Sequence, residues 1–84
     1  MVTKEMVVEA KSGLKSKPAA LFIQKACDYK SSIWIEREER KANAKSMLGL
    51  LSLSIGTGAR ISIIAEGEDE EAAVEELAEY INSL

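Results

Sequence analysis

A serine placed just ahead of a short apolar run is the feature of this chain best suited to chemistry. In residues 43–51, Ser46 precedes Met47 and Leu48. Its hydroxyl oxygen can accept a hydrogen bond from a backbone N–H in the first turn of a helix. The positive end of the helix dipole would also favour a phosphoryl group at that position. Two interpretations follow: Ser46 only caps a short helix, or it caps the helix and also accepts phosphate.

The rest of the chain offers few other reactive groups. Its 84 residues include no histidine, which excludes phosphohistidine chemistry and removes the usual general base and zinc ligand. The single cysteine excludes an internal disulfide and fits a reducing cytosol. Cys27 lies near the end of an apolar helical stripe, so we expect it to be a small core residue rather than a reactive thiol.

The acidic residues near the C-terminus are the remaining candidates for a metal or acid/base site. Glu75, Glu76 and Glu79 share one side of a predicted helix, without a ligand of another type beside them. The pattern therefore favours a solvated helix face, and we expect neither a metal nor a cofactor. The mixed charge run at residues 36–41 likewise indicates a solvated hairpin tip.

Composition limits the class of protein. The length allows one domain, covering residues 1–84, and 46% apolar with 30% charged residues is typical of a globular protein. No apolar run approaches the roughly 18 to 20 residues that span a bilayer. The first residues show no secretory signal pattern, so we expect a cytoplasmic protein without a membrane partner. A net charge of −3 argues against direct nucleic-acid binding.

The elements that must position Ser46 follow from hydrophobic periodicity. Alternation and β-branched runs predict strands at residues 5–11, 33–36, 41–43 and 60–65. Helices are predicted from Ser16 to about residue 28, after Ser46, and after Asp69, with each of these three residues as the N-cap. In the short helix, Leu50 and Leu53 are the better core candidates, while Met47, Leu48 and Leu51 could face either way.

This order predicts an α+β fold, an open-faced β-sandwich. Four strands interrupted by helices in so short a chain indicate one mostly antiparallel sheet, with three helices on one face. The predicted order is β-α-β-β-α-β-α.

Three segments resemble the HPr family, the small phosphocarriers of the bacterial sugar phosphotransferase system. They are Gly13-Leu14-x-x-x-Pro18-Ala19, Asn43-x-Lys45-Ser46-x-x-Gly49-x-x-Ser52-Leu53 and Ala65-x-Gly67-x-Asp69-Glu70. The resemblance covers essentially the whole chain in register, and it implies the same open-faced sandwich.

The chain departs from the family at the phosphocarrier site. Family members carry Gly-x-His-x-Arg-Pro-Ala, whereas this chain has Lys15 at the histidine position and Lys17 at the arginine position. Lysine, with an ordinary pKa of about 10.4, is protonated near neutral pH and has no free lone pair to accept a phosphoryl group. We therefore expect no catalytic residue, no enzymatic activity and no histidine relay.

The resemblance extends to a histidine-free branch of the family, the catabolite-repression HPr (Crh) proteins of Bacillus-type bacteria. It implies that Ser46 is the regulatory phosphorylation site, modified by HPr kinase/phosphorylase. It also implies a corepressor role with catabolite control protein A, a LacI-type regulator. Lys17, Met47, Leu48 and Leu51 would contact this partner, with Lys17 weakening the contact because it lacks the planar fork of arginine.

Two other interpretations remain at this stage. The first is an HPr-type phosphocarrier of sugar transport, which the missing histidine opposes. The second is an assembly role, because Crh-type chains can exchange their first strand between subunits. Residues 11–16 would then form the hinge of a strand-swapped homodimer, in place of a monomer.

Overall fold

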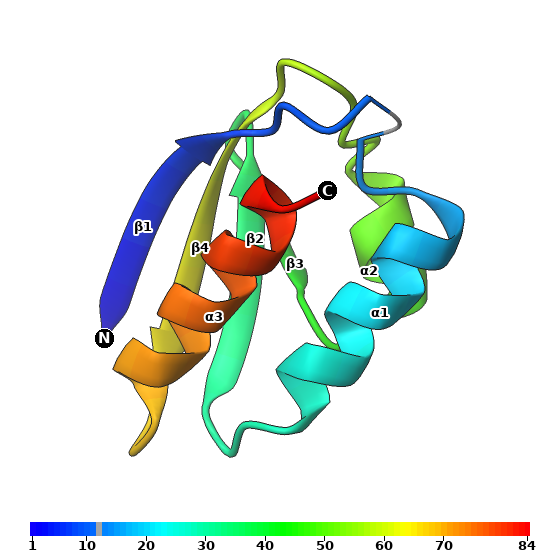
Figure 1. The fold of residues 1–84 in the computed structure, drawn as a ribbon. Helices are drawn as coiled ribbons and strands as arrows, with labels where there is room; N and C mark the ends of the chain where they lie inside the picture. Colours follow the sequence, from blue (N-terminus) through cyan, green and yellow to red (C-terminus); the bar gives the residue numbers. More distant parts are fainter. Residues whose placement is uncertain (12) are drawn as a thin grey trace.

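The computed structural model describes residues 1–11 and 13–84 of the chain. Seven elements follow one another in the predicted order (Figure 1). They are β1 (Val2–Val7), α1 (Ser16–Cys27), β2 (Ser32–Arg37), β3 (Arg40–Asn43), α2 (Met47–Ser52), β4 (Arg60–Glu66) and α3 (Glu70–Asn82).

The four strands form one sheet in the order β1-β4-β2-β3. Each of the three strand pairs is antiparallel, with Lys4 opposite Ile63 between β1 and β4, and Ile35 opposite Ile63 between β2 and β4. The helices cover one face of this sheet, as Figure 1 shows most clearly for α1 and α3. The predicted open-faced sandwich is confirmed, and β4 and β2 are the two inner strands of the sheet.

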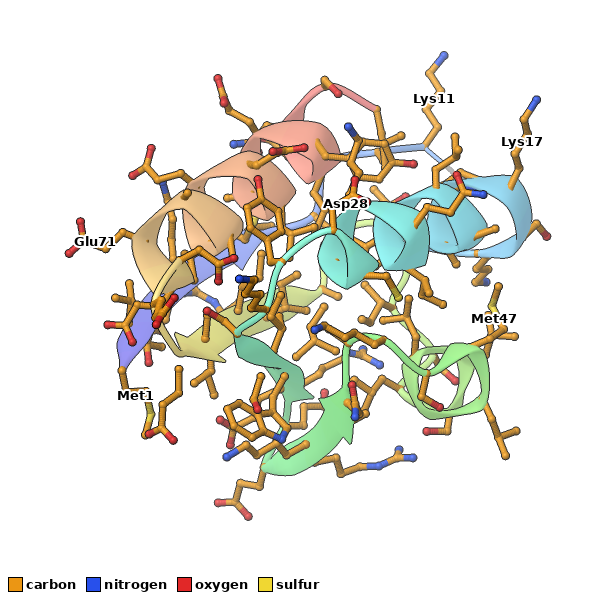
Figure 2. The ribbon with its side chains drawn as sticks, turned by 90° about the horizontal axis from the view of Figure 1, so that it is seen from below. Met1, Lys11, Lys17, Asp28, Met47 and Glu71 are labelled. Carbon is orange, nitrogen blue, oxygen red and sulfur yellow. The ribbon has the colours of Figure 1, made fainter. Side chains whose placement is uncertain are left out.

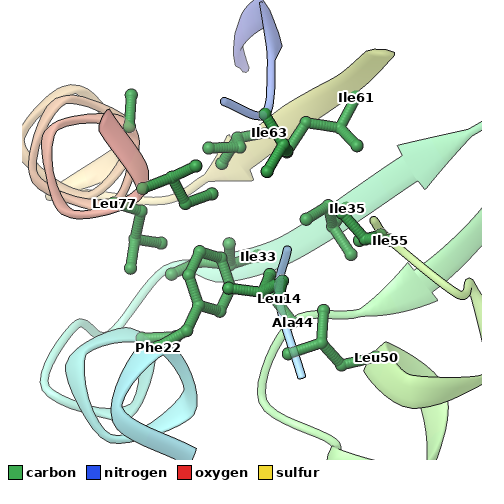
Figure 3. Packing of buried hydrophobic residues seen from close by; sticks show 14 of the residues in the cluster. Leu14, Phe22, Ile33, Ile35, Ala44, Leu50, Ile55, Ile61, Ile63 and Leu77 are labelled. Carbon is green, nitrogen blue, oxygen red and sulfur yellow. The ribbon is translucent and has the colours of Figure 1, made fainter. Parts of the chain in front are cut away.

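The core lies between the sheet and the helices (Figure 3). Alternate residues of β2 and β4 point into it, because successive side chains of a strand face opposite ways. The helices close it with buried residues at three- and four-residue spacing. Its largest fully buried side chains include Leu14, Phe22, Ile33, Ile35, Leu50, Leu53, Ile55, Ile63 and Leu77.

The first strand is shorter at its C-terminal end than its alternation predicts. β1 ends at Val7, although Val8 and Ala10 remain buried as the pattern requires. Beyond the end of β1, Val8 bonds to the loop before β4. Its N–H donates to the carbonyl of Ala59 at 2.9 Å, and its carbonyl accepts from the N–H of Gly58 at 2.7 Å. Side-chain alternation therefore continues past the end of the regular strand. The predicted break and hinge include Ser12, which lies outside the described residues.

One of the three predicted N-caps is wrong, and a second is confirmed in position but makes no side-chain cap bond. The N-cap of α1 is Lys15, without a side-chain hydrogen bond, and Ser16 is the first helical residue, with φ at +53°. Asp69 does occupy the N-cap position of α3, but its carboxylate makes no cap bond and instead binds a distant turn.

The prediction that Cys27 belongs to the core is also wrong, since its side chain is exposed. The buried stripe of α1 runs through Ala19, Phe22 and Ala26, while Ile23 is only half-buried. Cys27 lies about 100° further around the helix than Ala26, beyond the edge of that stripe.

Candidate functional site

Ser46 occupies the N-cap position of α2, as predicted. Its backbone is extended, with φ at −113°, and its Oγ accepts a hydrogen bond from the backbone N–H of Gly49 at 3.1 Å. Its carbonyl oxygen accepts from Leu50 at 2.9 Å. Ser46 is half-buried as a residue, so part of it is accessible to solvent. The cap is confirmed, whereas phosphorylation of Ser46 stays a prediction.

The chain leading into Ser46 is held by a second set of hydrogen bonds. The Oδ1 of Asn43 accepts from the backbone N–H of Lys45 at 2.8 Å, and the carbonyl of Asn43 accepts from Ser46 at 3.1 Å. The Nζ of Lys45 donates to the carbonyl oxygens of Tyr29 and Ser31, at 2.8 and 2.9 Å. Lys45 is part of the HPr-like motif around Ser46, but the spacing of residues along the chain did not predict that its side chain would bind these two carbonyls.

The turn that receives Lys45 is itself fastened to the start and middle of α3. Asp69 accepts hydrogen bonds from the Ser31 hydroxyl and from the backbone N–H groups of Lys30 and Ser31, and these bonds hold the pKa of its carboxyl below the usual range. The Tyr29 hydroxyl donates to the carboxylate of Glu76, which raises the pKa of Tyr29 to about 12.

The C-terminal end of α2 is held by two arginines of the predicted hairpin tip. Arg37 donates to the carbonyls of Leu53 and Ser54 at 3.0 and 3.1 Å, and Arg40 donates to that of Ser52 at 2.7 Å. These bonds satisfy carbonyls that a helix end leaves without partners. The charge run is therefore only partly a solvated tip, because two of its members brace α2.

Three apolar side chains of α2 face solvent beside Ser46, and we call them the α2 patch. Met47, Leu48 and Leu51 are 39%, 82% and 44% exposed. In contrast, Leu50 and Leu53 are 0% and 2% exposed, as the core prediction required. The structure thus shows that these three side chains face solvent, a question that the sequence left open. Binding of a partner by the α2 patch stays a prediction.

The lysines that replace the phosphocarrier residues lie at the N-terminal end of α1. Lys15 and Lys17 are both exposed, and Figure 2 shows Lys17 on the same side of the molecule as Met47, opposite Glu71. Leu21 on α1 is a further exposed apolar residue, at 40%, that sequence reasoning did not single out. Its only signal was its place outside the apolar stripe of α1.

The acidic face of α3 matches the solvated interpretation in two of its three residues. Glu75 and Glu79 are exposed, whereas Glu76 is half-buried and binds Tyr29 and, at 3.5 Å, Lys25. The prediction missed this contact because Tyr29 lies 47 positions away along the chain.

Comparison with known proteins shows that the chain matches one family. Residues 2–83 match the family model described as the PTS HPr component phosphorylation site. The HPr-like protein Crh of Bacillus subtilis is 46% identical over 81 residues, covering 96% of this chain and 95% of the relative. The Crh protein of Halalkalibacterium halodurans is 49% identical, covering 96% of each chain. The phosphocarrier protein HPr of Borreliella burgdorferi is 45% identical, covering 100% and 98%.

Solved structures of proteins from the same family are similar to this fold. HPr-C-His from Thermoanaerobacter tengcongensis has a TM-score of 0.96 and 41% identity, covering 99% of this chain and 93% of that one. A crystal structure of Bacillus subtilis Crh, described as a dimer with a swapping domain, has a TM-score of 0.79 and 44% identity, covering 99% and 95%. This chain therefore belongs to the HPr family, and within that family it is similar to the Crh proteins.

Proposed function

We propose that this protein is a Crh-like regulator of carbon catabolite repression that is switched by phosphorylation of Ser46. The observation that carries the proposal is the position of Ser46, a half-buried N-cap residue directly before the exposed α2 patch. A phosphoryl group there adds a charge of about −1.5 to −2 beside an apolar docking surface. One modification would thus change both the charge and the binding properties of the same face.

The proposed modifying enzyme is HPr kinase/phosphorylase, and the proposed partner is catabolite control protein A. Phosphate oxygens form strong, charge-assisted hydrogen bonds with arginine and lysine, so basic groups on the regulator would bind phosphoserine. Met47, Leu48 and Leu51 would dock on an apolar surface, for which a flexible methionine is well suited. Lys17 would add a weaker polar contact than an arginine at that position.

The protein would act by binding and not by catalysis. The HPr and Crh proteins that it resembles are carriers and regulators, which is consistent with the lack of a nucleophile at Lys15. In residues 1–11 and 13–84, none of the helices combines the length and apolarity needed to cross a bilayer. We place the protein in the cytoplasm, where its proposed kinase and regulator would act, and assign it no direct contact with nucleic acid.

Phosphorylation followed by binding tests this proposal. The wild-type protein and Ser46→Ala would be incubated with HPr kinase/phosphorylase and ATP, and each product would then be titrated with catabolite control protein A. We expect one phosphate on the wild type, none on Ser46→Ala, and tight binding only by the phosphorylated wild type. Equal labelling of both proteins, or labelling of neither, would contradict the proposal.

A phosphocarrier role is the alternative function, supported by the similarity to the Borreliella burgdorferi HPr protein. It requires a group that accepts phosphate from phosphorylated Enzyme I. Lys15 stands at that position, and the chain has no histidine to replace it.

A further inference from the structure

Lys45 is adjacent to Ser46, yet its ammonium group is directed elsewhere. Both of its hydrogen bonds run to backbone carbonyls of the α1–β2 turn, from Nζ to Tyr29 at 2.8 Å and to Ser31 at 2.9 Å. The side chain is half-buried. A lysine next to a phosphorylated serine would ordinarily be interpreted as a counter-ion, but here two of its three N–H donors are already bound.

The turn that Lys45 binds is a rigid anchor. Ser31 is 1% exposed, and its backbone N–H and that of Lys30 donate to Asp69 at 3.0 and 2.9 Å. Tyr29 is bound through its hydroxyl to Glu76. Both acidic residues belong to or directly precede α3, which packs on the sheet. The ammonium group of Lys45 is therefore fixed to the body of the fold.

The backbone of the same residue continues directly into the cap. The N–H of Lys45 is held by the Oδ1 of Asn43 at 2.8 Å, and the next residue is Ser46, whose Oγ accepts from Gly49. Since α2 has only six residues, it has little stability of its own and depends on contacts at its ends. Loss of the Lys45 contacts would weaken the hold on the chain at the point where α2 begins.

We propose that Lys45 is the positioning residue of the Ser46 phosphate acceptor. Its two bonds to the Tyr29 and Ser31 carbonyls fix the backbone that presents the Ser46 hydroxyl, and they keep its ammonium group from neutralising the phosphate. The full charge of the phosphoserine is then left for the partner. This inference rests on the proposed phosphorylation of Ser46.

The test compares Lys45→Met, which keeps the length of the side chain but removes its donors, with Lys30→Met as the matched control. Lys30 is an exposed lysine of the same turn, so its replacement removes one charge nearby. In the unmodified proteins, amide hydrogen exchange at Ser46 and Gly49 should be at least about tenfold faster in Lys45→Met, because charged hydrogen bonds are lost. It should be unchanged in Lys30→Met. Unchanged exchange in Lys45→Met would overturn the anchor, and this readout requires no kinase.

Kinetics with HPr kinase/phosphorylase show whether the anchor positions the acceptor. We expect kcat/KM for Lys45→Met to fall by roughly 10- to 100-fold, mainly through kcat, because the hydroxyl is misplaced in the bound state. Lys45→Arg, which keeps donors for both carbonyls, should recover most of the loss. Unaltered kcat in Lys45→Met would overturn the positioning role. Absence of phosphate on the wild type would instead contradict the proposed function.

A phosphorus NMR titration separates positioning from charge neutralisation. With phosphoserine installed at position 46 by genetic-code expansion, its second pKa should be the same in the wild-type and Lys45→Met proteins. A counter-ion would stabilise the dianion, so its removal would raise that pKa. A raised pKa in Lys45→Met, with Lys30→Met unchanged, would show that Lys45 pairs with the phosphate and would overturn the inference.

Discussion

At the scale of single residues, one hydroxyl serves the fold and the proposed switch without conflict. The Oγ of Ser46 accepts a hydrogen bond from Gly49, and phosphate oxygens at the same position can accept that bond more strongly, because they are charged. Phosphorylation therefore need not disrupt α2. The resemblance puts Lys15 at the position of the family's phosphocarrier histidine, and Ser46 is the proposed switch.

The contribution of the Ser46 hydroxyl to the stability of the fold can be measured in the unphosphorylated protein. Ser46→Ala should lower the free energy of unfolding by about 1 kcal/mol, because the N–H of Gly49 loses its acceptor. Ser46→Asn, which keeps a capping oxygen, should stay close to the wild type. Urea denaturation monitored by circular dichroism gives both values. Equal stability of Ser46→Ala and the wild type would show that the cap contributes nothing.

Asp69 gives the fold a defined dependence on pH. The hydrogen bonds that it accepts from the Ser31 hydroxyl and from the backbone N–H groups of Lys30 and Ser31 hold the folded-state pKa of the carboxyl below its ordinary value of 3.8. The stabilisation is therefore complete above pH 3.8 and is lost as the pH falls through the lower, folded-state value. Asp69→Asn should melt below the wild type near neutral pH, and the two melting temperatures should converge in acid. A constant difference across this range would contradict the assignment.

At the scale of the elements, α2 has one buried side and one exposed side. Leu50 faces the core and Leu48 faces solvent, although the two residues are only two positions apart in the chain. The hairpin arginines Arg37 and Arg40 hold the end of α2, while Lys45 holds the residues before it. The α2 patch therefore lies on a short helix that is anchored by side-chain hydrogen bonds at both ends.

Alanine substitutions on the two sides of α2 should have opposite effects. Leu50→Ala should reduce the free energy of unfolding by about 2 to 5 kcal/mol, since it leaves a cavity in the core. Leu48→Ala should change it by less than about 0.5 kcal/mol. It should nevertheless weaken binding of the phosphorylated protein to catabolite control protein A by about tenfold or more. Titration calorimetry provides the affinity, and unchanged binding by Leu48→Ala would remove the α2 patch from the proposed interface.

The β2–β3 hairpin turns through two non-glycine residues with left-handed backbones. Glu38 and Glu39 have φ values of +50° and +67°, a conformation that strains residues with a Cβ. Glu39→Gly should therefore raise the free energy of unfolding by up to about 1 kcal/mol. Glu36→Gly within β2 is the control and should lower it, because glycine weakens a strand. Stabilisation by both substitutions, or by neither, would contradict backbone strain as the cause.

At the scale of the whole molecule, local periodicity in the sequence predicted the architecture. It did not predict the side-chain contacts between residues that are far apart in the chain. The strand and helix order follows from alternating and three-to-four spacings, and so does the exposure of part of the charged faces. The site differs, because Lys45 and Asp69 act through a turn that is 14 to 39 positions away in the chain. Cys27 was misplaced for a related reason: a stripe defines a helix face, but the width of the buried part depends on what packs against it.

The oligomeric state is also a property of the whole molecule. In the structure β1 pairs with β4 of its own chain, whereas one Crh structure is described as a swapped dimer. Exchange of β1 would replace these pairings by the same pairings between two copies. We therefore expect light scattering to find a monomer in fresh samples and a dimer in aged, concentrated ones, with the same circular dichroism spectrum. A single monomeric species throughout would contradict strand exchange.

The central claim is that this member of the HPr family retains the serine switch and lacks the phosphoryl relay. The most direct measurement incubates one preparation with two phosphoryl donors in parallel and determines the attached phosphate by intact-protein mass spectrometry. With HPr kinase/phosphorylase and ATP, we predict one phosphate that Ser46→Ala cannot accept. With Enzyme I and phosphoenolpyruvate, we predict none. Stoichiometric, acid-labile phosphate from Enzyme I, or none from the kinase, would contradict the claim.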